Sequence, residues 1–179
     1  MSTYALIDVD GVLNPYAAKP HRRPEGFQTF YLSATSGEVW DERPSGRVSR
    51  GSALRIWFNP DHGPRLLRLA EETGCTLVWA TMWERLANEV LAPRLGLPEL
   101  PMLTFPRVRA FPYHPKTSVI TRAMRGDDFV WFDDEATHHD ESYFEEHHDA
   151  GSLLVHTNPA TGVTEEQFVQ AADWLSTRA

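Results

Sequence analysis

Two acidic residues near the start of the chain have a spacing that suits phosphoryl chemistry. Asp8 and Asp10 lie two positions apart in the sequence DVDGVL, directly after the apolar run at residues 4–7. Carboxylate oxygens are ligands that Mg²⁺ prefers, and one carboxylate could attack a phosphorus atom while the other moves the proton. Turn and cap carboxylates are an equally simple explanation of an isolated D-x-D pair. The pair therefore needs support from residues elsewhere in the chain.

A second acidic pair, Asp133 and Asp134, follows the apolar run at residues 129–132. Parallel strands end at the same edge of a sheet, so we expect the two pairs to meet there. Crowded carboxylates repel one another unless a cation lies among them. The two pairs therefore predict a metal site, and Mg²⁺ suits its oxygen ligands.

Two further positions could bind a phosphate. Thr81, Met82 and Trp83 follow the apolar run at residues 76–80, where a hydroxyl and the free N–H groups of a helix start suit an anion. Lys116 begins a predicted helix and could neutralise phosphate charge. Taken singly, Thr81 is explained as a helix cap and Lys116 as a solvated surface lysine.

Short apolar runs that alternate with helical patterns indicate a layered α/β fold. The predicted strands are residues 4–7, 76–80, 102–105, 129–132 and 152–156. The predicted helices are residues 64–73, 83–95, 117–125 and 164–176. We expect the strands to form a parallel sheet whose carboxyl edge carries the polar residues above.

Residues 14–60 break this alternation and are too long for an ordinary loop. They contain the strand-like stretches FQTFYLS and ALRIWF, so we interpret them as a β-rich insertion, a flap or small cap, within a single domain of residues 1–179. The alternative is an edge hairpin that only extends the sheet. Its side chains could bind a phosphodiester and stack bases, although solubility and packing explain them equally well. The residues concerned are Arg22, Arg23, Arg43, Arg47, Arg50, Arg55, Phe27, Phe30, Tyr31 and Trp40.

Taken together and in order, these polar residues resemble the four-motif signature of the haloacid dehalogenase (HAD) superfamily. The signature consists of D-x-D-G-V-L, a strand-terminal Thr, a Lys and D-D. Four stretches are similar, more narrowly, to the actinobacterial and phage branch that includes the HAD domain of Swiss Army Knife RNA repair proteins. These stretches are residues 77–88, 95–101, 131–135 and 153–164.

The resemblance implies a Rossmann-like three-layer sandwich with a five-stranded parallel sheet in the order 5-4-1-2-3. It also implies a role for each residue of the signature. Asp8 would be the nucleophile and a Mg²⁺ ligand, and Asp10 the general acid and base, with its backbone carbonyl on the metal. Asp133 would be a direct metal ligand and Asp134 a second one, direct or through water. Thr81 would supply the phosphate-binding hydroxyl, and Lys116 would be the charge-stabilising lysine.

The expected function is that of a Mg²⁺-dependent phosphomonoesterase that works through an aspartyl-phosphate. Its substrate would be a nucleotide, a nucleic-acid end or a small phosphorylated metabolite. One alternative is a phospho-acceptor signalling module, although the order of the acidic residues, the Thr and the Lys argues against it. A non-catalytic binding domain is the other alternative, and the presence of all four motifs argues against that one.

Charge and composition narrow the class further. The net charge of −8 disfavours a protein that coats duplex nucleic acid, although residues 14–60 carry a net charge of +3 and residues 101–125 one of +5.

No apolar run is long enough to span a membrane and no signal peptide is evident, so we expect a cytoplasmic protein without membrane partners. The single Cys75 excludes an intramolecular disulfide. The histidines around the acidic segment at residues 138–149 fit no standard zinc motif and predict a solvated helix or loop.

Overall fold

A four-stranded parallel sheet forms the centre of the molecule. The computed structural model describes residues 2–33, 35–45, 53–106 and 113–178. The strands are β1 (Thr3–Ile7), β5 (Thr76–Trp79), β6 (Asp128–Asp133) and β7 (Ser152–His156), in the order β5-β1-β6-β7. The side chains of β1, β5 and β6 are largely buried because helices cover both faces, as is usual for parallel sheets, whereas those of the edge strand β7 are mostly half-buried. β1 therefore lies between β5 and β6, with Ile7 in register with both Trp79 and Phe132.

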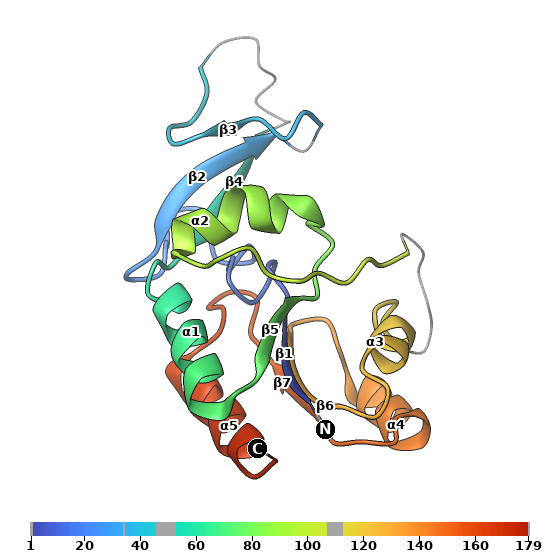
Figure 1. Ribbon diagram of the computed structural model, residues 1–179. Helices are drawn as coiled ribbons and strands as arrows, with labels where there is room; N and C mark the ends of the chain where they lie inside the picture. The colour runs from blue at the N-terminus through green and yellow to red at the C-terminus, as the bar shows by residue number, and fades with distance from the viewer. Residues whose placement is uncertain (1, 34, 46–52, 107–112, 179) are drawn as a thin grey trace.

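Helices on the two faces of this sheet complete a three-layer arrangement (Figure 1). The helices α1 (His62–Thr73) and α5 (Glu165–Ser176) lie side by side on one face, and α3 (Thr117–Ala123) and α4 (His138–His147) lie on the other. Thr164 and Gln167 form a capping box at the start of α5. None of the helices in the described residues is long and apolar enough to cross a membrane.

The prediction of a fifth parallel strand at residues 102–105 is wrong. This segment contributes one isolated parallel bridge, between Met102 and Trp79, with backbone hydrogen bonds to Trp79 from Leu103 and from Trp79 to the carbonyl of Pro101. The pairing stops there because Pro101 and Pro106 bound the segment and proline has no N–H to donate to a ladder. The four remaining strands keep the neighbours predicted for them.

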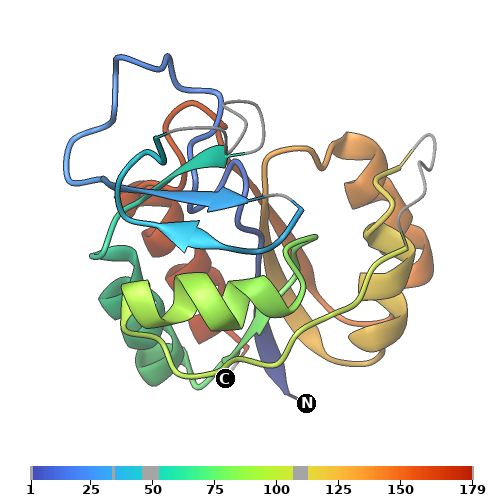
Figure 2. The same ribbon diagram turned by 90° about the horizontal axis from the view of Figure 1, so that it is seen from above.

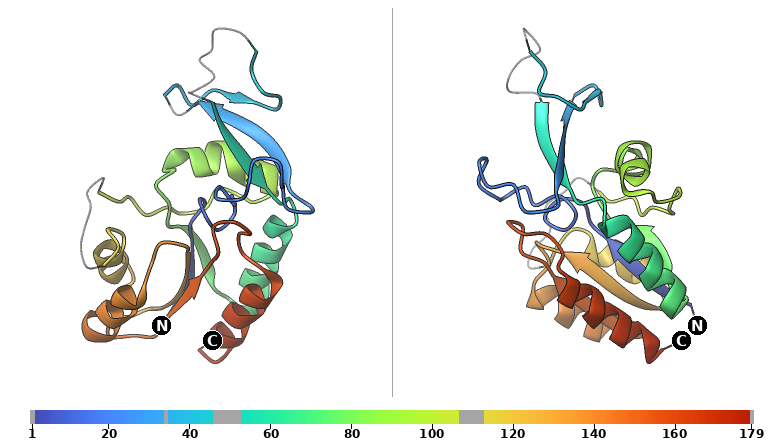
Figure 3. Two further views of the ribbon diagram at one scale, coloured as in Figure 1. Left: turned by 180° about the vertical axis from the view of Figure 1, so that it is seen from behind. Right: turned by 90° about the vertical axis from the view of Figure 1, so that its left-hand side faces the viewer.

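A second, antiparallel sheet rises above the carboxyl edge of the first (Figure 3). It consists of β2 (Gln28–Ser33), β3 (Val39–Trp40) and β4 (Ala53–Phe58), in the order β3-β2-β4. The two sheets share no paired strand among the described residues, so this segment does not extend the parallel sheet.

The helical segment after β5 lies beneath the antiparallel sheet (Figures 1 and 2). A π-helical turn, η1 (Ala87–Leu91), leads into α2 (Ala92–Leu95), where a single α-helix over residues 83–95 was predicted. Pro93 explains the difference, since its ring clashes with the carbonyl four residues earlier and a wider turn relieves the clash. Phe30 and Ile56 of the antiparallel sheet share one apolar core with this helical segment.

A buried histidine joins the antiparallel sheet region to the helical layer. His62 begins α1, and its ring lies 5.5 Å from that of Phe27 and 6.0 Å from that of Phe168, centroid to centroid. Burial, assisted by the positive charge of Arg65, lowers the pKa of His62 to about 4. The folded chain therefore holds this imidazole neutral at a pH where an unfolded chain would protonate it.

We expect the free energy of unfolding to fall as the pH drops from about 6.5 to about 4, because only the unfolded state binds the His62 proton in that range. His62 should account for a loss of about 2 kcal/mol in the free energy of unfolding between about pH 7.5 and about pH 5. Urea unfolding at both pH values should show a smaller loss for His62→Gln than for the wild type. The exposed His21→Gln serves as the control and should behave as the wild type does. Equal losses in all three proteins would contradict the assignment.

Candidate active site and metal centre

Asp8 lies at the carboxyl end of the central strand, where the sheet still fixes its backbone. Its N–H donates to the carbonyl of Phe132 at 3.1 Å, which continues the pairing of β1 with β6. Its side chain is only slightly exposed, and one carboxylate oxygen accepts a hydrogen bond from the N–H of Val9 at 2.7 Å. The parallel sheet therefore sets the position of this carboxylate.

Lys116 connects Asp8 to the second acidic pair. Its ammonium lies 2.5 Å from Oδ2 of Asp8 and 2.8 Å from Oδ2 of Asp133, and all three side chains are buried. The other oxygen of Asp133 accepts hydrogen bonds from the N–H groups of Glu135 and Ala136. The alternative of a solvated surface lysine is therefore wrong.

Burial and charge compete at this cluster. Burial raises the pKa of Asp8 to about 7, with Lys116 opposing the rise and Asp133 adding to it. Burial alone would lower the pKa of Lys116, but the two carboxylates outweigh it and raise that pKa. The ammonium is therefore held in its charged form, and one cation is left to balance at least two carboxylates.

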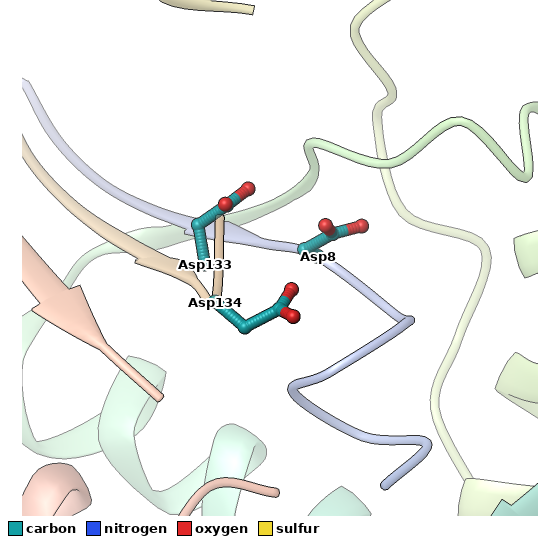
Figure 4. A group of neighbouring side chains, drawn as sticks. All are labelled: Asp8, Asp133 and Asp134. Carbon is teal, nitrogen blue, oxygen red and sulfur yellow. The ribbon is translucent and has the colours of Figure 1, made fainter. Parts of the chain in front are cut away.

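Asp134 adds a third carboxylate to this group (Figure 4). One oxygen each from Asp8, Asp133 and Asp134 lies within 4.8 Å of the others. Burial and the charge of Asp133 raise the pKa of Asp134. Gly11, at a φ of +75°, leaves the room that Asp134 occupies, because a Cβ at that position would lie 2.0 Å from the Asp134 Cγ.

These three residues fit a Mg²⁺ ion. They supply the hard oxygen donors that Mg²⁺ prefers, and a divalent cation would relieve the repulsion that raises the pKa of Asp8 and of Asp134. Among the described residues, Asp8, Asp133 and Asp134 form the group of acidic, His or Cys side chains that lie close enough to one another to hold a metal ion. The histidines at residues 138–149 form no such group within the described ranges.

Asp10 points to a different set of partners. Its carboxylate accepts a hydrogen bond from Nδ2 of Asn14 at 2.7 Å and one from Nε1 of Trp83 at 2.9 Å. Asn14 is buried, and its Oδ1 accepts the N–H of Trp57 in β4 at 3.1 Å. Asn14 thus joins Asp10 directly to the antiparallel sheet, a role that the sequence analysis did not identify.

Thr81 and Met82 lie where the sequence predicts, at the end of β5. Thr81 is buried, and its hydroxyl accepts the N–H of Trp83 at 3.3 Å, which is the capping contact considered for it. Met82 is 42% exposed. The indole N–H of Trp83 donates a hydrogen bond to the Asp10 carboxylate, a contact that the sequence did not predict.

A cavity of about 990 Å³ lies between the carboxyl edge of the parallel sheet and the antiparallel sheet. Every predicted site residue lines it except Asp133, which is fully buried beneath. The antiparallel sheet and its turns form the opposite wall. Residues of that wall include Leu32, Ser33, Thr35, Gly37, Leu54, Arg55 and Ile56.

The arginines and aromatic residues of the insertion differ in whether they are buried, line the cavity or lie outside the described residues. Phe27 and Phe30 are buried, so they cannot stack on a base from solvent. Arg55 lines the cavity. Arg47 and Arg50 lie outside the described residues, as does the segment at residues 107–112 that carries part of the second basic stretch.

Comparison with known families places the chain in one of them. The family model described as the HAD domain in Swiss Army Knife RNA repair proteins matches residues 4–168, which include every residue of the site. Neither the curated proteins nor the solved structures contain a match to the chain. The family match covers nearly all of the sequence, and the chain belongs to this family of HAD domains, and so to the HAD superfamily.

Proposed function

We propose that the chain is a Mg²⁺-dependent phosphomonoesterase that forms an aspartyl-phosphate on Asp8. The observation that carries the proposal is the buried arrangement of Lys116 between Asp8 and Asp133, with Asp134 completing an acidic group on the cavity floor. This arrangement provides a nucleophile, a positive charge beside it and a set of metal ligands. The family supports hydrolase chemistry in general.

In the first step, a carboxylate oxygen of Asp8 attacks the phosphorus atom of the substrate. The bond from phosphorus to the leaving oxygen breaks, and Asp10 gives its proton to that oxygen. In the second step, Asp10 takes a proton from a water molecule whose oxygen attacks the phosphorus of the aspartyl-phosphate. The bond to Asp8 then breaks, which releases inorganic phosphate and restores both carboxyl groups.

The other residues of the site bind charge and hold it in place. The Lys116 ammonium offsets the negative charge of the phosphoryl oxygens near Asp8, and the Thr81 hydroxyl with the N–H groups after it binds those oxygens. Mg²⁺, held by Asp8, Asp133, Asp134 and the Asp10 carbonyl, would supply the positive charge that lets an anionic nucleophile approach an anionic substrate.

Trp83 and Asn14 act on Asp10 by fixing its carboxylate. Each donates a hydrogen bond to a different oxygen of that carboxylate, which restricts its orientation relative to the cavity. A proton donor must be held within hydrogen-bonding reach of the leaving oxygen. Both are therefore proposed as positioning residues.

A nucleotide or a nucleic-acid end is the substrate class that we favour. The association of the family with RNA repair proteins supports it, and the cavity is large enough for a nucleotide-sized group. The antiparallel sheet would then act as a small cap that contacts the substrate without enclosing it.

Asp8→Asn should lower phosphate release from an aryl phosphate in Mg²⁺ by roughly 10³-fold or more, because the amide cannot act as the nucleophile. Phosphate release measured over time checks this, with the exposed Asp149→Asn as control. Retained turnover in Asp8→Asn would exclude the proposed nucleophile. A stable, stoichiometric phosphorylation of Asp8 without turnover would favour the signalling module instead.

Trp83→Phe should lower kcat roughly 10-fold and leave KM nearly unchanged, since the variant keeps most of the ring but loses the N–H that holds Asp10. Steady-state kinetics on the same aryl phosphate separates the two constants. Trp174→Phe, on the outer helix α5, is the matched control. The positioning role is wrong if KM rises while kcat stays constant.

Mg²⁺ should raise the melting temperature of the wild type by about 5 to 10 °C at about 100 times its dissociation constant. This shift reports binding without any turnover. Asp134→Asn should lose most of the shift because it removes one carboxylate of the acidic group, whereas the exposed Asp173→Asn should keep it. An equal shift in wild type and Asp134→Asn would rule out Asp134 as a ligand.

A further inference from the structure

Three long-chain cations line the cavity in the described residues, and they differ in their partners: Lys116, Arg85 and Arg55. Lys116 lies between Asp8 and Asp133. Arg85 donates to both carboxylate oxygens of Glu89, at 2.8 and 2.6 Å. Among the described residues, no carboxylate side chain lies within ion-pair distance of Arg55, and every Asp and Glu of the sequence falls within the described ranges.

Stacking on an aromatic ring holds the Arg55 guanidinium in place, but it does not supply an acceptor for the hydrogen-bond donors of the guanidinium. The guanidinium carbon lies 3.6 Å from the centre of the Trp57 ring, two residues further along β4. This stacking uses the face of the guanidinium and leaves the N–H groups at its edge free to donate to a ligand. The Nε atom is buried and has no hydrogen-bond partner among the residues that the structure describes. A buried donor without a partner costs about 1 to 3 kcal/mol, so such an atom calls for a ligand that accepts its hydrogen bond.

Exposed apolar side chains gather at the same cavity. Five large hydrophobic residues of the described chain are exposed, and three of them line the cavity: Tyr16, Leu54 and Met82, at 46%, 49% and 42% exposure. The other two lie on the outer helices α1 and α5. An apolar or planar group bound in the cavity would therefore find contacts from the antiparallel sheet, from the segment that follows β5 and from the loop that follows Asp10.

We propose that Arg55 binds a second anionic group of the substrate, separate from the phosphate that reacts at Asp8. The apolar or planar part of the substrate, such as a base attached to the sugar that carries both anionic groups, would contact Tyr16, Leu54 and Met82. The proposal rests on the phosphomonoesterase function and narrows its substrates to phosphomonoesters that carry a second phosphate or a phosphodiester. The planar, fork-like guanidinium matches the oxygens of such groups, and its stacking on Trp57 orders it before binding.

The test compares adenosine 3′,5′-bisphosphate with adenosine 5′- and 3′-monophosphates. Arg55→Met should lower kcat/KM for the bisphosphate at least about 10-fold more than for either monophosphate, as expected when one charge-assisted hydrogen bond is lost. Arg43→Met changes an exposed arginine of the same insertion outside the cavity and should keep the wild-type ratio. If Arg55→Met fails to fold, Arg55→Lys keeps the charge but not the fork and should still lose part of the ratio.

A binding measurement separates this proposal from the proposed function. Calorimetric titration of the Asp8→Asn protein with adenosine 3′,5′-bisphosphate should give a dissociation constant about 10-fold higher when Arg55→Met is added. If the wild type hydrolyses no phosphomonoester but Arg55→Met still weakens this binding, the anion subsite stands and the proposed function fails. If turnover is present but the ratio and the binding are unchanged by Arg55→Met, the subsite is wrong and the function stands.

Discussion

The buried contact of Lys116 with Asp8 and Asp133 is the interaction on which the rest of the site depends. Neighbouring parallel strands β1 and β6 bring the two carboxylates to one edge of the sheet, where they would repel each other without the ammonium. Removing one partner of such a buried pair typically costs about 3 to 5 kcal/mol, because a charge is left uncompensated. One charge arrangement therefore fixes the proposed nucleophile, the proposed metal ligands and the start of α3.

Asn14 extends this fixed centre to the antiparallel sheet. Its amide nitrogen donates to Asp10 and its oxygen accepts the N–H of Trp57, so one buried side chain contacts both the proposed acid and base and the strand β4. Arg55 stacks on the same Trp57. Direct contacts thereby hold the strand that carries the proposed anion subsite to the residue that we propose as acid and base.

Of the five parallel strands that local patterns in the sequence predicted, four are present, with the expected polar residues after them. These patterns succeed because buried strands and the polar residues that follow them are adjacent in the chain. The strand at residues 102–105 failed because Pro101 and Pro106 limit its pairing. The contact of Trp83 with Asp10 spans 73 residues, and that of Asn14 with Trp57 spans 43. No periodicity or spacing reports such contacts. The same holds for Arg55, which composition alone does not distinguish from the other arginines of the insertion.

The central claim is that Asp8 carries the phosphoryl group during turnover. It is tested most directly by mixing the protein with an aryl phosphate and Mg²⁺, stopping the reaction with acid within the first turnover and locating the phosphoryl group by peptide mass spectrometry. A phosphoryl group is expected on Asp8 that appears with substrate and disappears as turnover ends. Turnover with no phosphoryl group on Asp8 in the stopped samples, or with the group on another residue, would contradict the claim.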